Sequence, residues 1–349
     1  MLNASHHLRF AAAREPISEG YPAVAPPHPR GFSVKFPPPG FTPSPSPLTN
    51  SFFTVLTPQE LEMRLQWMFY VMTKSENHDA APFKEMILKY LDQRELQTMA
   101  SLLTSDSDYF LMIARNKNGS KRIQKLLGIT DDVDTFAAAI LGRFLHIITD
   151  KYASYVARRG IAVFNKKKKE AMYERILHYA LYIARDKHGC LALNDIITDA
   201  DDLYYRNKLF DVIAHKAILL SNDAYGNFVI QHVLKLNDLC CKNNIVVSLR
   251  GHFVDLSIQR YGSYIVNLLL ETEESMVVVV EELLEGDRLM RLTRNAYGNF
   301  VLCKALRVTL KEMVRTDLYW GLVHKLKPFH NPLRRSRGSN IASILDSIC

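Results

Sequence analysis

A short turn followed by the start of a helix recurs along this 349-residue sequence at a nearly constant interval. The small residue of the turn, Gly or Ala, stands at positions 119, 153, 189, 226, 262 and 298, so successive copies lie 34, 36, 37, 36 and 36 residues apart. A weaker seventh copy, Arg337-Gly338-Ser339, follows 40 residues later. A unit of about 36 residues holds two or three short helices and cannot bury its apolar face alone. The spacing therefore predicts an all-α fold in which helical repeats stack into an α-solenoid.

The distribution of proline divides the sequence into two parts. Residues 1–50 contain 11 of the 15 prolines, and because proline fixes φ and cannot donate a backbone hydrogen bond, this segment is predicted to be a disordered, Pro-rich tail. No proline occurs between Pro82 and Pro328, and the strong apolar periodicity there predicts a helical repeat domain over residues 51–349. We expect degenerate copies or a cap over 55–100, a C-terminal cap over 318–349, and clear repeats around 101–136, 137–172, 173–208, 209–245, 246–281 and 282–317.

The helix that follows each turn has one apolar side. In the copy that begins at Asn227, the residues Val229, Ile230, Val233 and Leu234 share one face at 100° per residue. The other copies repeat this apolar stripe, which is predicted to form the core of the solenoid. An Asp or Asn commonly stands a few residues before the small residue, where one helix is expected to end in a sharp turn. The next helix then begins with Ser, Asn or Cys, of which Ser and Asn suit the start of a helix.

The other side of the same helix carries a triplet whose middle member is aromatic in four of the six copies and is flanked by two polar residues. Asn227 and Gln231 are four residues apart and therefore adjacent, and Phe228 lies beside Gln231. A ring next to a hydrogen-bonding pair suits an unstacked nucleobase, because the ring stacks on the base face while the pair reads the base edge. The structural alternative is that these aromatic residues close the contact between repeats. The six triplets are Ser120, Lys121, Gln124; Ser154, Tyr155, Arg158; Cys190, Leu191, Asn194; Asn227, Phe228, Gln231; Ser263, Tyr264, Asn267; and Asn299, Phe300, Cys303.

Charge and composition narrow the class of partner. The formal net charge is +8 and the sequence pI is about 9.1, which favours a polyanionic partner. The five cysteines are scattered without a CxxC pair, as expected for reduced thiols in a cytosolic or nuclear protein. No apolar run approaches the roughly 20 residues that span a bilayer. Sequence motifs of metalloproteases, P-loop proteins and serine hydrolases are absent, so we expect no enzymatic activity, no metal and no cofactor.

The segment from Asp223 to Leu234 closely resembles the recognition-helix motif of the pumilio (PUF) family of RNA-binding proteins. Residues 119–127, 259–267 and 295–304 are also similar to repeats of that family. The resemblance covers roughly residues 90–349 and is nearest to the shorter plant members. It implies a pumilio-type, armadillo-like superhelix. The family normally has eight repeats with end caps, whereas six are clear in this sequence.

The resemblance also implies how each triplet would act. The first and third members contact a base edge and the second stacks, so that Asn227 with Gln231 would take U and Ser120 with Gln124 would take A. Ser154 with Arg158 is similar to the pair that takes C. The pairs of the remaining three repeats depart from the family pattern and leave their bases open: Cys190 with Asn194, Ser263 with Asn267, and Asn299 with Cys303.

The partner implied by the family is single-stranded RNA, bound antiparallel to the protein at UGUA-like elements of mRNA 3′ untranslated regions. Such binding regulates translation and mRNA stability in the cytoplasm, with the nucleus or nucleolus as the alternative, and can recruit translation or decay factors. Basic groups such as Arg260 and Lys304, helped by Lys166 to Lys169, are expected to contact phosphates. The protein is expected to be monomeric. The competing interpretation is a protein-binding scaffold of armadillo or HEAT type without RNA specificity.

Overall fold

The computed structural model describes residues 57–74, 93–129, 133–236, 238–285, 288–311, 315–334 and 339–347. Every described residue belongs to one compact unit, Pro38–Cys349. The Pro-rich tail predicted over 1–50 and the anchor Gly338 lie outside the described residues. Within the described ranges the regular structure is entirely helical, which confirms the predicted fold class.

The described helices form one leading helix, α1 (Pro58–Thr73), and seven successive groups. Most groups consist of a long helix, a short helix and the helix that carries a triplet. In the third group the long and short helices are merged into one. The groups are α3 (Gln93–Thr104), α4 (Ser107–Ala114), α5 (Lys117–Leu126); α6 (Val133–Gly142), α7 (Phe144–Ile148), α8 (Ser154–Val163); α9 (Lys166–Ala184), α10 (Gly189–Asp199); α11 (Leu203–His215), α12 (Ala217–Ser221), α13 (Gly226–Lys235); α14 (Leu239–Leu249), α15 (Phe253–Ser257), α16 (Gly262–Leu269); α17 (Glu273–Leu284), α18 (Leu289–Thr293), α19 (Ala296–Lys311); and α20 (Thr316–Leu326), η2 (Lys327–Phe329), α21 (His330–Arg334), α22 (Ser339–Asp346).

The groups begin between four and nine residues before the repeat boundaries expected from the sequence, except for the last, which begins two residues before position 318. Capping residues determine where several of the long helices begin. Asp202 accepts a hydrogen bond from the backbone of Tyr204, and Asp238 accepts one from Cys241, so each satisfies a free N–H at the beginning of a long helix. The apolar period alone contains no such local boundary.

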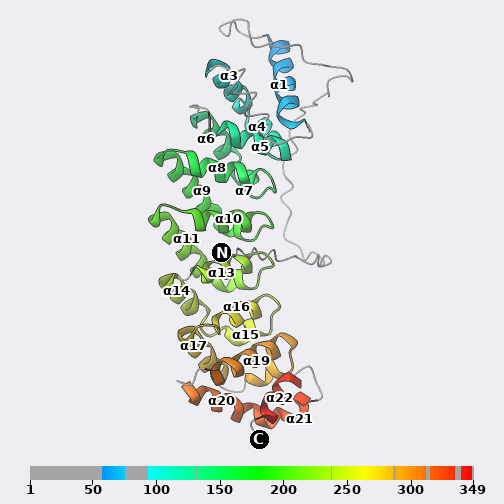
Figure 1. Ribbon diagram of the computed structural model, residues 1–349, viewed down its shortest axis with the longest axis vertical. Coiled ribbons are helices and arrows are strands. Elements are labelled where there is room, and N and C mark those ends of the chain that lie inside the picture. Colours follow the sequence, from blue (N-terminus) through cyan, green and yellow to red (C-terminus); the bar gives the residue numbers. More distant parts are fainter. Residues whose placement is uncertain are drawn as a thin grey trace, which may run out of the picture. The chain divides into compact units, whose positions relative to one another are not determined.

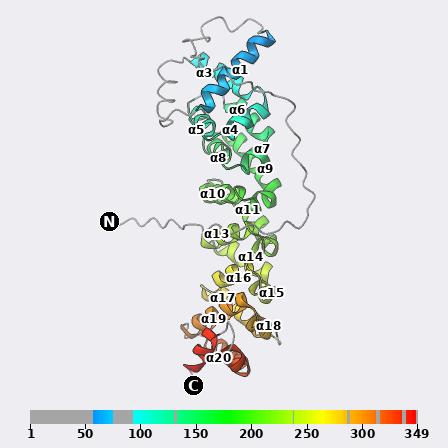
Figure 2. The same cartoon turned by 90° about the vertical axis from the view of Figure 1, so that its right-hand side faces the viewer.

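The groups stack so that equivalent helices touch. Helices α5, α8, α10, α13, α16 and α19, which carry the triplets and are called here the triplet row, each contact the next, and α1 and α22 extend the row at its two ends. Helices α3, α6, α9, α11, α14, α17 and α20 form the opposite row in the same way (Figure 1). Figure 2 shows the same order of helices from a second direction. The stacking thus brings the triplets next to one another in chain order.

The turn before each triplet-row helix is built alike in five repeats. Asp223 Oδ1 accepts hydrogen bonds from Tyr225 N (2.9 Å) and Gly226 N (2.8 Å), and Asn116, Asp150, Asp186 and Asn295 make the equivalent pair. The small residue of the turn sits against the preceding short helix. A Cβ on Gly119 would lie 2.1 Å from the carbonyl oxygen of Ile113, so the close approach explains the glycine.

The predicted apolar stripe forms the core. Val229, Ile230, Val233 and Leu234 are each at most 6% exposed, and the equivalent residues of the other repeats join them in one continuous hydrophobic cluster. Full burial of each such side chain stabilises the fold by roughly 1.5–3 kcal/mol. In the part of the chain that the structure describes, no helix has the length and apolarity to cross a membrane.

Candidate nucleic-acid interface

The second member of every triplet is exposed. The exposed fraction ranges from 39% for Phe228 to 68% for Phe300, with Tyr155, Leu191 and Tyr264 between them, and Lys121 is exposed as well. These residues occupy the same position on helices that contact one another in sequence. Their side chains therefore do not close the contact between repeats, which was the structural alternative for the aromatic residues. Five of the six, all except Lys121, provide a row of exposed apolar side chains, four of them aromatic.

The first members are buried, with exposed fractions of 1–7%, although they lie on the side of the helix away from the apolar stripe. Ser120 contacts the following repeat, because its hydroxyl donates a 2.6 Å hydrogen bond to the carbonyl of Tyr152. Cys190, Asn227 and Ser263 instead donate to carbonyls of the turn that precedes their own helix. The buried first members are Ser120, Ser154, Cys190, Asn227, Ser263 and Asn299.

In α5 the buried first member orients the third. The single proton of the Ser120 hydroxyl is engaged with Tyr152, so Ser120 Oγ can only accept from Gln124. Gln124 Nε2 donates to that oxygen at 3.1 Å and to the Ser120 carbonyl at 3.2 Å. The carboxamide of Gln124, which is half-buried, is thereby turned so that its oxygen remains as an acceptor.

The same logic orients Gln231 in α13. Asn227 Nδ2 donates to the carbonyls of Asp223 (2.8 Å) and Ala224 (3.0 Å), which leaves Asn227 Oδ1 as the acceptor. Gln231 Nε2 donates to that oxygen at 2.8 Å. Because backbone carbonyls can only accept, this chain of hydrogen bonds fixes both amide orientations and again leaves the Gln231 carboxamide oxygen to accept from a ligand.

In α8 the third member is paired across the repeat boundary. Arg158 Nη1 lies 2.6 Å from Asp195 Oδ2, and Nη2 lies 3.9 Å from Asp199 Oδ2, both on α10. The guanidinium also lies over the ring of Tyr155, 5.6 Å from its centroid. Arg158 is thus held by a carboxylate of the next triplet-row helix and by the ring of its own triplet. Gln124 and Gln231, in contrast, donate to the first member of their own triplet.

The other three triplets offer weaker hydrogen-bonding groups. Burial raises the pKa of the Cys190 thiol to about 11, and this thiol points to the carbonyl of Lys187 at 3.5 Å. Ser263 donates to the carbonyl of Arg260 at 3.1 Å. Asn194 Oδ1 and Asn299 Oδ1 are buried and have no hydrogen-bond partner among the described residues.

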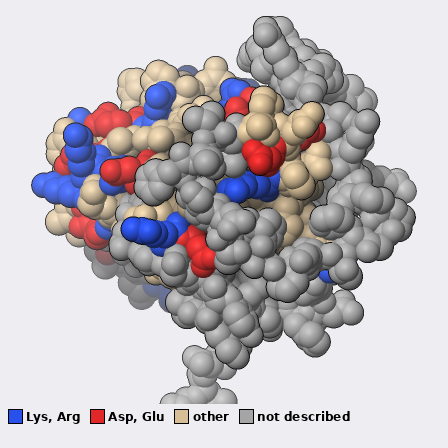
Figure 3. All heavy atoms as spheres, turned by 90° about the horizontal axis from the view of Figure 1, so that it is seen from above, with Lys and Arg blue, Asp and Glu red and all other residues tan. Residues whose placement is uncertain are grey.

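The basic groups expected to contact phosphates are distributed unevenly. Lys304 on α19 pairs with Glu271 at 3.3 Å, and the Arg260 guanidinium lies 5.4 Å from the ring centroid of Tyr261. Lys168 and Lys169 lie in the first turn of α9, on the opposite row, and pair with Asp134 and Asp201. The lysine run therefore lies away from the triplets. Figure 3 shows Lys and Arg interspersed with Asp and Glu on the described surface that it displays.

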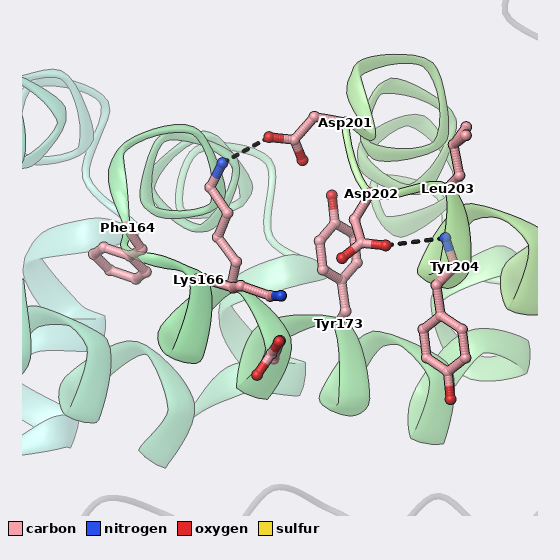
Figure 4. Close-up of a pocket in the computed structure, with 9 residues that line it drawn as sticks. Phe164, Lys166, Tyr173, Asp201, Asp202, Leu203 and Tyr204 are labelled. Carbon is pink, nitrogen blue, oxygen red and sulfur yellow. Dashed lines mark hydrogen bonds and ion pairs between the residues drawn. The ribbon is translucent and has the colours of Figure 1, made fainter.

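A cavity of about 540 Å³ lies beside the lysine run. Figure 4 shows Lys166, Tyr173, Asp201 and Tyr204 among its lining residues, with the amide of Tyr204 donating to Asp202. The lining mixes both signs of charge, and Lys169 pairs with Asp201 at 2.9 Å. Over the described ranges, no three His, Cys, Asp or Glu residues are grouped so as to hold a metal ion.

Comparison with known proteins places this geometry in a family. Residues 179–214, 216–238 and 252–284 match the Pumilio-family RNA binding repeat. The putative pumilio homolog 20 of Arabidopsis thaliana is 78% identical over 348 residues, covering 99% of both chains. Pumilio homolog 18 of the same plant is 57% identical over 343 residues, covering 97% of this chain and 98% of its own.

Solved structures share the fold. The Puf4 RNA binding domain bound to an HO endonuclease RNA 3′ UTR recognition sequence aligns with a TM-score of 0.67 at 21% identity, covering 82% of this chain and 89% of its own. The RNA-binding domain of yeast Puf5p bound to MFA2 RNA aligns with a TM-score of 0.62 at 16% identity, covering 82% and 89%. The plant relatives and the matched repeats together show that this chain belongs to the pumilio family, as one of its short plant-type members.

Proposed function

We propose that this chain binds single-stranded RNA along the triplet row, with one base facing each repeat. The observation that carries the proposal is the row of exposed second members, because five of the six are flat or apolar side chains repeated in phase on helices in contact. Stacking of a base on an aromatic ring contributes roughly 1–3 kcal/mol. The polar third member beside each ring then supplies the contact with the base edge.

The fixed orientations of Gln231 and Gln124 favour particular bases at the α13 and α5 repeats. At α13 the acceptor oxygen of Gln231 suits a base that carries a proton on its ring nitrogen, and uracil N3–H meets this requirement beside the ring of Phe228. At α5 the acceptor oxygen of Gln124 suits the exocyclic amine of adenine. These are the bases that the family resemblance implies for the two repeats.

The biological role that follows is post-transcriptional control. The relatives at 78% and 57% identity carry pumilio names, and the solved structures named above hold an RNA 3′ UTR recognition sequence and MFA2 RNA. By analogy the chain would bind UGUA-like elements in mRNA 3′ untranslated regions, in the cytoplasm, and change translation or mRNA stability by bringing decay or translation factors to the message. Equilibrium binding of this kind needs no catalytic group.

Affinity selection from random single-stranded RNA with the full chain tests the proposal. The expected result is an enriched motif with U and A at positions that correspond to α13 and α5. Binding should weaken with salt, with a slope in log–log form of roughly −0.7 per phosphate contacted. A duplex of the same sequence is the matched control and should not compete.

A protein-binding scaffold, the alternative function, predicts no enriched RNA motif and no preference for single-stranded RNA. If the selection enriches no motif, and if single-stranded and duplex RNA compete equally, the triplet row does not read bases. The exposed aromatic row would then have to be assigned to a protein partner.

A further inference from the structure

The pairing of Arg158 sets the α8 repeat apart from the other repeats. Its guanidinium lies 2.6 Å from Asp195 and 5.6 Å from the centre of the Tyr155 ring, and the arginine side chain is only 28% exposed. In α5 and α13, by contrast, the third member donates to the first member of its own triplet. The α8 repeat therefore presents the exposed ring of Tyr155 together with a guanidinium that is already paired with Asp195.

The sequence around the triplets shows why this happens at one repeat. The residue directly after the third member is basic in four repeats and Leu in another, and it is acidic only in α10, where it is Asp195. Because α8 and α10 are in contact, this one carboxylate faces the arginine of the preceding triplet. The five counterparts of Asp195 are Lys125, Arg159, His232, Leu268 and Lys304.

We propose that Asp195 is a positioning residue that holds Arg158 beside Tyr155, so that the α8 repeat stacks a base without reading its edge. The inference rests on the proposed RNA binding. Stacking on Tyr155 leaves the ion pair intact, whereas a bidentate contact between a base and the Nη1 edge of the guanidinium competes with Asp195 for the same donors. Asp199, 3.9 Å from the other guanidinium nitrogen, adds a second carboxylate on the same side.

The hydrogen-bonding groups of arginine indicate which base preference the Asp195 carboxylate suppresses. A guanidinium only donates hydrogen bonds, so a free Arg158 would favour a base with adjacent acceptors on its pairing edge. Cytosine, with O2 and N3, fits this description best. The cytosine preference that the resemblance implies for Ser154 with Arg158 is thus expected only when the neighbouring carboxylate is removed.

The test compares affinities of the full chain for four RNAs that differ only at the nucleotide facing α8. That nucleotide is the neighbour of the one facing α5, and the nucleotide facing α10 separates it from the one facing α13. The α5 and α13 positions are marked by the preference changes in Gln124→Arg and in Asn227→Ser/Gln231→Glu. The wild type should bind the four RNAs within about threefold of one another. Asp195→Asn, and more strongly Asp195→Asn/Asp199→Asn, should favour cytosine by about tenfold, the scale of one good bidentate contact.

Two controls separate positioning from general charge effects. Asp255→Asn/Asp317→Asn removes two ion-paired carboxylates outside the triplet row, which pair with Arg291 at 3.0 Å and Arg315 at 2.9 Å. This variant should bind all four RNAs alike, with no new preference. In Gln124→Arg, the new arginine in α5 is faced by Arg159, the counterpart of Asp195, and not by a carboxylate. This variant should therefore prefer cytosine at the α5 position with no second substitution.

Two results would overturn the inference while leaving RNA binding in place. One is a wild type that already prefers cytosine tenfold at the α8 position, and the other is a pair of Asp195 variants whose preferences match the wild type. A wild type that enriches no RNA would overturn the proposed function and this inference together. Thermal denaturation of each variant confirms that it is folded before its affinities are compared.

Discussion

Gln231 donates a 2.8 Å hydrogen bond to Oδ1 of Asn227, one turn earlier in α13, while Asn227 donates to two carbonyls of the preceding turn. The two amides therefore form one relay in which the buried residue orients the half-buried one. A change of base preference at this repeat should require both residues to change, because either one alone leaves the other in its present orientation or without a partner.

The first prediction concerns that relay. Asn227→Ser/Gln231→Glu should move the preference at the α13 position from U toward G, because a carboxylate accepts from the N1–H and the amine of guanine. Affinities for four RNAs that differ at this nucleotide measure the effect, and the preferences at other positions should stay unchanged. Retained preference for U in the double variant would contradict the relay.

The second prediction concerns the stacking ring. Phe228→Ala should weaken RNA binding by roughly 1–3 kcal/mol with little change in base preference, since every base offers a face to stack. Val247→Ala is the matched control, because Val247 is an exposed apolar residue on α14 of the opposite row. Titration of labelled RNA compares the two, and an equal loss of affinity in both would argue against a binding role for Phe228.

The third prediction concerns the turn that starts α5. Gly119→Ala should lower the free energy of unfolding by about 1–3 kcal/mol, because the added Cβ would overlap the carbonyl oxygen of Ile113 and the backbone must move. Gly321→Ala is the control. Its Cβ would meet only the end of the Leu284 side chain, at 3.1 Å, and alanine favours the helix, so stability should change by less than about 1 kcal/mol. Denaturant unfolding curves distinguish the two cases.

The fourth prediction concerns pH. Burial lowers the pKa of His232, whose Nε2 lies 2.8 Å from Thr198 Oγ1 on the neighbouring α10. The folded chain then binds fewer protons at this site than the unfolded chain. The resulting stability is present above the unfolded pKa of about 6.5 and is lost as the pH falls through the lowered folded value. Melting temperatures between pH 7.5 and pH 5 should therefore fall less in His232→Gln than in the wild type, and parallel curves would count against this role.

The sequence determined the repeat, the helical class and the exposed second members, because these follow from periodicity along a single helix. The turn glycines, the stripe around Val229 and the exposed ring of Phe228 all depend on neighbours within a few residues. The start of each repeat was displaced by up to nine residues, since capping residues such as Asp202, and not the apolar period, decide where a long helix begins.

Only the tertiary structure decided which polar groups of a triplet are left to meet a base. The first members are buried in the packed chain, and the capture of Arg158 depends on Asp195, which is 37 residues away in the sequence and belongs to the next triplet-row helix. Periodicity describes each helix separately and says nothing about a side chain that reaches across to its neighbour. Contacts between repeats therefore had to be read from the packed chain.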